Sequence, residues 1–129
     1  MKPESRNYLS KAKQKLDRAE RAAQAQLPDI AAREAYFAAL AATRALIFES
    51  AEFVTKTHVG ASKKFHEAVA QRKLIADDLM AVLDDGREIK SVVDYDIGPL
   101  PSAEVASAYL SRTRKFVAAI EALLASGKL

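Results

Sequence analysis

The sequence contains no cysteine, which excludes disulfides, thiolate metal sites and cysteine nucleophiles. Glycine and proline are scarce, with four of each in 129 residues, so few turns interrupt the chain. No apolar run reaches the roughly 18 residues that a membrane span needs, because Thr43 and Arg44 break the longest one, at residues 35–48. The first residues are polar and charged and provide no apolar core for a signal peptide. Together these absences predict a cytoplasmic protein without a membrane segment.

Alanine is the abundant residue and makes up about a fifth of the chain. Because alanine loses no side-chain entropy in a helix, this composition favours helices. No segment shows the sustained alternation of apolar and polar residues that predicts a strand. The length fits one domain over residues 1–129, large enough to bury a core without disulfides or structural metals. We therefore predict an all-α fold, an up-and-down bundle of four long helices plus one short helix.

The second expected helix dominates the pattern. The first helix should cover residues 3–26, and the second should cover residues 30–55 with Asp29 as its N-cap. The second is apolar on nearly all sides, which places it in the centre of the bundle or partly in a subunit interface. We therefore expect a homodimer. The large residues expected in the core are Phe37, Leu40, Phe48, Phe65 and Phe116.

The second half of the chain predicts three further helices. A short one should begin at Ser62, a favourable N-cap. The next shows one apolar face over residues 75–93, with Gly86 as a point where it can break. The last should follow the loop at residues 98–101 and begin at Ser102.

Charge is unevenly distributed along the chain. Residues 1–27 carry seven basic and three acidic side chains, whereas residues 74–101 carry seven acidic and two basic ones. The fold should therefore have a basic side and an acidic side. This separation favours docking between proteins over dedicated nucleic-acid binding, which usually needs more cations and interleaved aromatic residues.

His58 is a candidate site residue because it lies in a polar turn beside Thr57 and Gly60. Histidine there can act as a general base or bind phosphate. The alternative, which we favour, is that it caps or hydrogen-bonds the helix expected at Ser62. His66 is expected at the surface, and no third ligand lies at metal-site spacing, so no metal is predicted.

Arg44 is a candidate because it is the one charged residue in the apolar run at residues 35–48 of the second helix. Its guanidinium must reach solvent, a carboxylate or a ligand phosphate. The carboxylates expected to pair with it are Glu49, Glu52, Asp94 and Asp96. A salt bridge is the interpretation that we favour over anion binding.

No catalytic set is apparent from the remaining residues. The aspartate pairs at residues 77–78 and 84–85 fall mostly on a face expected to be solvated. The chain has no glycine-rich phosphate loop, nucleophile elbow or helical zinc motif. The sequence therefore predicts neither a catalytic residue nor a cofactor.

Three short segments occur in a specific order: AYFA at residues 35–38 followed by Arg44, THVG at residues 57–60, and KSVVDYD at residues 90–96. In this order and spacing they resemble a small-protein branch of the HEPN domain family, and the likeness extends over residues 8–124. The resemblance implies a helical protein of a prokaryotic toxin–antitoxin or nucleotidyltransferase-linked system.

The chain departs from the ribonuclease members of that family. Those members resemble one another in an arginine followed four to six residues later by a histidine, and no such pair occurs here. Lys90 and Tyr95 stand at the comparable place, and Ala41 stands where many relatives have a further histidine. Lysine lacks the bidentate guanidinium fork, and tyrosine is a poor base near neutrality. These departures argue against catalysis.

The resemblance therefore implies a non-catalytic interaction module. We expect a homodimer that pairs with a nucleotidyltransferase or a toxin–antitoxin partner. One alternative is an RNA-cleaving or RNA-binding toxin with a non-standard site, and another is a small nucleotide-binding domain in which Arg44 or Lys90 meets the phosphate. The candidate residues for binding a ligand or partner are Arg44, His58, Lys90, Asp94 and Tyr95.

Overall fold

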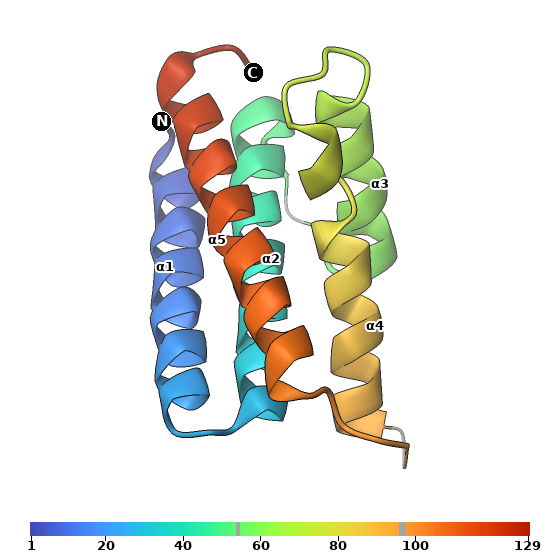
Figure 1. The fold of residues 1–129 in the computed structure, drawn as a ribbon. Coiled ribbons are helices and arrows are strands. Elements are labelled where there is room, and N and C mark those ends of the chain that lie inside the picture. Colours follow the sequence, from blue (N-terminus) through green and yellow to red (C-terminus); the bar gives the residue numbers. More distant parts are fainter. Residues whose placement is uncertain (54, 96–97) are drawn as a thin grey trace.

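The computed structural model describes residues 1–53, 55–95 and 98–129. Within these ranges the chain is a bundle of α-helices with no strand, as the sequence predicts (Figure 1). The helices are α1 (Pro3–Gln24), α2 (Pro28–Ala51), α3 (His58–Val69), α4 (Val82–Tyr95) and α5 (Ala103–Ser126), with a short 3-10 helix, η1 (Asp77–Leu79), before α4.

The turn between α1 and α2 lies two residues earlier than the sequence suggested. α2 begins at Pro28, whose fixed φ suits the first position of a helix. Asp29 therefore lies in the first turn, and Leu27 occupies the N-cap position, so the prediction of Asp29 as the cap is wrong. The negative charge of Asp29 still favours the positive end of the helix. The helix ends at Ala51, where Glu52 adopts a left-handed conformation.

α3 begins four residues earlier than predicted. Thr57 has an extended backbone, and its Oγ1 accepts a hydrogen bond from the Gly60 N–H at 3.0 Å. This is the geometry of a threonine N-cap. The predicted cap, Ser62, instead lies inside the helix, and His58 becomes its first residue.

α4 runs through Gly86 without a break, a question that the sequence left open. The helical ladder begins only at Val82, after η1 and the turn that follows it. Gly86 is buried. A Cβ at this position would lie 1.8 Å from the Tyr109 hydroxyl and 2.9 Å from Tyr36, which leaves no room for a side chain. The glycine therefore allows α4 to pack closely against α5 and α2.

The core lies around α2, which contacts every other α-helix (Figure 1). Phe65 and Phe116 are both 0% exposed, and Leu40 is also buried, as predicted. The prediction is wrong for Phe37 and Phe48, which are only half-buried. They lie three turns apart on α2, along a side that the neighbouring helices leave partly open.

α5 begins as the sequence predicted. The Ser102 side chain caps it by accepting a hydrogen bond from the Val105 N–H at 3.2 Å. The basic helix α1 and the acidic helix α4 lie at opposite edges of the bundle (Figure 1). Among the described residues, no helix combines the length and the hydropathy needed to cross a membrane.

Candidate functional site

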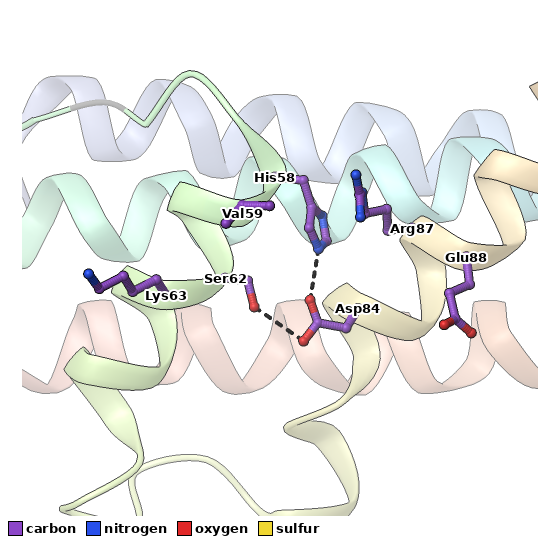
Figure 2. Close-up of a pocket in the computed structure, with 7 residues that line it drawn as sticks. All are labelled: His58, Val59, Ser62, Lys63, Asp84, Arg87 and Glu88. Atoms are coloured by element: carbon purple, nitrogen blue, oxygen red, sulfur yellow. Dashed lines mark hydrogen bonds and ion pairs between the residues drawn. The ribbon is translucent and has the colours of Figure 1, made fainter.

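A hollow of about 410 Å³ opens between the first turns of α3 and the start of α4 (Figure 2). Its polar lining comes from only these two helices, which the close-up shows facing each other. The lining residues are His58, Val59, Ser62, Lys63, Asp84, Arg87 and Glu88.

Both ring nitrogens of His58 are occupied by hydrogen bonds. Its Nε2 lies 2.7 Å from Asp84 Oδ1, and its Nδ1 lies 2.9 Å from the Tyr36 hydroxyl. Because a carboxylate only accepts, Nε2 donates to Asp84, and Nδ1 of the neutral ring then accepts from Tyr36. His58 thereby connects α2, α3 and α4. It does not cap its own helix, so that expectation is wrong.

Asp84 also links α4 to α3, a role that the sequence did not indicate. Its Oδ2 accepts a hydrogen bond from the Ser62 hydroxyl at 3.2 Å, so one carboxylate holds two residues of α3 (Figure 2). The neighbouring Asp85 pairs with Arg112 at 2.9 Å. Asp84 is exposed and Asp85 is partly exposed, as expected for a solvated face, but both also form contacts that the sequence did not indicate. The partners of these carboxylates are separated from them by 20 residues or more in sequence, so no local pattern identifies them.

Tyr36 supports the cluster from the core. Burial raises the pKa of its hydroxyl, while the charges of Lys90, Arg87 and Arg44 lower it in part and Asp84 adds to the increase. The hydroxyl is therefore protonated at neutral pH and available to donate to His58. In the sequence Tyr36 stands out only as part of a family segment, and nothing local indicates this role.

Lys90 and Asp94 form an ion pair on the last turns of α4. The Lys90 Nζ lies 3.1 Å from Asp94 Oδ2, and the Nε of Arg33 on α2 lies 3.0 Å from Oδ1. Burial alone would raise the pKa of Asp94, but hydrogen bonds and charge from Lys90 and Arg33 outweigh it and lower the pKa. The hydrogen bond to Asp94 raises the pKa of Lys90. Tyr95 is 77% exposed, and its ring centroid lies 4.9 Å from Lys90 Nζ.

We expect the pair to stabilise the fold only between acid and strongly alkaline pH. Since the pKa of Asp94 is lowered in the folded state, its contribution is complete above its unfolded value, about 3.9, and disappears as the pH falls through the folded value. Since the pKa of Lys90 is raised, its contribution is complete below about 10.4 and disappears as the pH rises further. Asp94→Asn should cost about 0.5–1 kcal/mol near neutrality.

Urea unfolding of wild type and Asp94→Asn across pH measures this contribution. The difference between the two proteins should shrink toward zero at the acid end. Glu88→Gln, an exposed change on the same helix, is the control and should show no comparable dependence. A difference that stays constant down to strongly acid pH contradicts the expectation.

Arg44 lies in a different place from His58. It lines a groove of about 370 Å³ between α1 and α2, which we call the basic groove. Among the described residues Arg44 has no ion pair, so the predicted salt bridge is wrong within them. Glu49 and Glu52 both bind Lys2 instead, and Asp94 binds Arg33 and Lys90. The remaining carboxylate considered, Asp96, lies outside the described residues. The groove is lined by Tyr8, Lys11, Lys15, Arg33, Phe37, Leu40, Ala41 and Arg44.

The predicted candidates therefore form two groups. Lys90 and Asp94 are joined to the basic groove through Arg33, whereas His58 lines the separate hollow of Figure 2. Arg33 was not among the predicted residues, although its distance from Arg44 along the sequence could have indicated it. Eleven residues are close to three helical turns, so Arg33 and Arg44 share one face of α2. Among the described residues, no group of three or more histidine, aspartate or glutamate side chains could hold a metal ion.

Comparison with known proteins agrees with this architecture. No curated protein matches the chain. The sequence profile of the HEPN domain matches residues 5–123, which include all of α2, α3 and α4 and most of α1 and α5. The chain therefore belongs to the HEPN domain family.

Proposed function

We propose that residues 1–129 form a single, non-catalytic HEPN interaction module. In this proposal the module forms a symmetric homodimer and pairs with a further protein of a toxin–antitoxin or nucleotidyltransferase-linked system. The resemblance stated above supports the choice of partner class. The surface of the bundle supports the interaction itself.

The observation that carries the proposal is a concentration of exposed apolar side chains at one end of the bundle. Eight large apolar residues are exposed in the described part of the chain, and five lie where α1 meets α2 or α4 meets α5 (Figure 1). Exposed apolar clusters on a protein surface mark interaction sites. We call this surface the apolar end. Its members are Leu27, Ile30, Tyr95, Leu100 and Val105.

The apolar end is also hollowed. A groove of about 550 Å³ separates the α1–α2 turn from the start of α5. It is lined mostly by small side chains: Ala23, Gln26, Pro28, Ala103, Ala106 and Ser107. A hollow with an apolar rim can receive a protruding side chain from a partner surface.

The burial of α2 and the charges of α1 and α4 both favour the apolar end as the dimer interface. α2 was expected to offer an apolar face to a second subunit, but fourteen of its residues are buried within the same chain. The basic helix α1 and the acidic helix α4 both run to this end of the bundle, at its opposite edges (Figure 1). A twofold axis can place the basic edge of one copy against the acidic edge of the other, which suits an isologous interface.

Sedimentation equilibrium of Leu27→Asp tests the dimer. The introduced charge would have to be buried without a partner, so the dimer dissociation constant should rise by about tenfold or more. Aspartate is a favourable residue at the N-cap position that Leu27 occupies, so α2 should remain intact. The matched control is Val59→Asp, which charges an exposed apolar residue outside the apolar end and should leave the constant unchanged. A wild type that is monomeric throughout the micromolar range contradicts the dimer.

The same preparations test the non-catalytic part. Metal-independent RNA cleavage needs a base, an acid and a cation close together. Here both His58 nitrogens are engaged, Lys90 is held by Asp94, and Lys90 is not among the described residues that line the hollow of His58. We expect no cleavage of a structured RNA by wild type. Cleavage that disappears in either His58→Ala or Lys90→Ala at matched purity would favour the toxin alternative.

A further inference from the structure

One face of α2 lines the basic groove with a cation at each end and apolar residues between them. Arg33 and Arg44 are the two ends, and Phe37, Leu40 and Ala41 lie between them along the helix. Steps of three or four residues keep these positions on one face. At 1.5 Å per residue, the two arginines are about 16 Å apart along the helix axis. The groove is therefore long enough to contact about three turns of another helix.

Phe37 lies at the centre of this face, and its ring is only half-buried. The Arg33 guanidinium carbon lies 4.9 Å from the ring centroid, and the Nζ atoms of Lys15 and Lys90 lie 5.7 Å and 5.9 Å from it. Cation–π attraction holds these charges around the ring. An apolar side chain that covered the ring would therefore lie among cations, where acidic residues on either side of it would be stabilised.

Positive charge exceeds negative charge along the groove. Two of its cations, Lys11 and Arg44, have no carboxylate partner among the described residues. The other three cations share two carboxylates, which leaves a surplus of three positive charges. The cations are Lys11, Lys15, Arg33, Arg44 and Lys90, and the carboxylates are Glu34 and Asp94.

Arg44 also has an unsatisfied donor. Its Nε is buried and has no hydrogen-bond acceptor among the described residues. A buried donor without an acceptor costs free energy, more so when it carries charge. A carboxylate suits the planar guanidinium, which can donate two parallel hydrogen bonds to it. A carboxylate carried on an apolar helix face would satisfy Arg44 and also cover Phe37 and Leu40, whereas a free anion would do only the first.

We propose that the basic groove docks an amphipathic helix of a partner protein, with an acidic residue at each end of its apolar stripe. In this arrangement one carboxylate lies beside Arg44 and another beside Arg33, and the apolar residues between them cover Phe37 and Leu40. Helices bind in grooves through anchors spaced three or four residues apart. The inference rests on the proposed function only in requiring a partner protein. It does not require the dimer, because the residues of the apolar end do not line the basic groove.

Fluorescence anisotropy with labelled, helix-stabilised peptides measures this docking. The test peptide carries glutamate, leucine, leucine and glutamate at positions i, i+4, i+7 and i+11, which is the spacing of the α2 face, and should bind wild type. Replacing both glutamates with lysine should weaken binding by about tenfold or more, because it reverses the charge complementarity. Replacing both leucines with alanine should have a similar effect, because the apolar stretch is then left uncovered.

Variants of the protein locate the binding. Arg44→Gln should weaken binding of the test peptide by about tenfold or more, and Arg44→Lys by less, because lysine keeps the charge but loses the fork. Lys11→Gln removes an exposed cation of the groove and should weaken binding severalfold. Lys115→Gln is the matched control, because it removes an exposed cation of α5 outside the groove, and should leave binding unchanged. Circular dichroism of each variant verifies that the bundle is folded.

The outcomes separate this inference from the proposed dimer. Leu27→Asp, which tests the dimer, should bind the test peptide as wild type does, and loss of binding in that variant would place the docking at the apolar end instead. A monomeric wild type that still binds the peptide contradicts only the dimer. The docking proposal is overturned if the test peptide does not bind, or if the peptide without leucines binds equally well. It is also overturned if a short single-stranded RNA binds while the test peptide does not.

Discussion

Replacing Phe116 or Phe65 with alanine is expected to lower the free energy of unfolding by about 3–5 kcal/mol. Both side chains are 0% exposed, and their ring centroids lie 5.4 Å apart with the planes tilted. The contact joins α3 to α5. A cavity left at either position would therefore be enclosed by the core and closed to solvent. Small domains are stable by only about 5–15 kcal/mol, so either variant should be close to unfolding.

Urea denaturation followed by far-ultraviolet circular dichroism measures this loss. Phe53→Ala is the matched control, because Phe53 is exposed and Lys64 Nζ lies 5.5 Å from the centroid of its ring. That change should cost less than about 1 kcal/mol. The double variant should cost less than the two single losses together, since the rings touch each other. A loss at Phe116 no greater than at Phe53 would contradict the packing described here.

The order and class of the elements were predictable because they depend on patterns that repeat every turn. Apolar residues at helical spacing and a high alanine content identify helices wherever they pack. The start of α3 was not predictable in the same way, because Thr57 and Ser62 are both good N-caps. Only the observed hydrogen bond from Gly60 distinguishes them. The half-buried Phe37 was also missed, because an apolar pattern does not reveal which face the other helices leave open.

The candidate site, like the fold, could be predicted from the sequence only in part. Single residues could be selected from the sequence, since a charge in an apolar helix or a histidine in a polar turn is unusual. Their partners could not, because Tyr36 and Asp84 lie 22 and 26 residues from His58. Arg44 was expected to find a carboxylate, yet the nearby Glu49 binds the chain's beginning at Lys2. Such pairings depend on how the helices are packed, which local spacing does not contain.

Gly86→Ala should destabilise the bundle by about 2–4 kcal/mol, although alanine favours a helix by about 1 kcal/mol over glycine. The new methyl would lie 1.8 Å from the Tyr109 hydroxyl and 2.9 Å from Tyr36. Tyr109 is buried and donates a hydrogen bond to the Val82 carbonyl at 2.9 Å. Moving the ring away would break this bond and leave the Tyr109 hydroxyl buried without a partner, while the Val82 carbonyl keeps its place in the helical ladder of α4. The clash therefore outweighs the gain in helix propensity, and thermal or urea unfolding should show the loss.

The origin of this loss can be tested with a second substitution. Tyr109→Phe removes the atom closest to the new methyl, while the rest of the ring, at 2.6 Å, still has to shift. It should therefore cost less in the Gly86→Ala background than in wild type, where it only removes the hydrogen bond to Val82. Ser91→Ala, an exposed change on the same helix, serves as the control and should be neutral or slightly stabilising. If Gly86→Ala instead behaves like Ser91→Ala, then α4 does not pack against α5 as closely as the buried glycine implies.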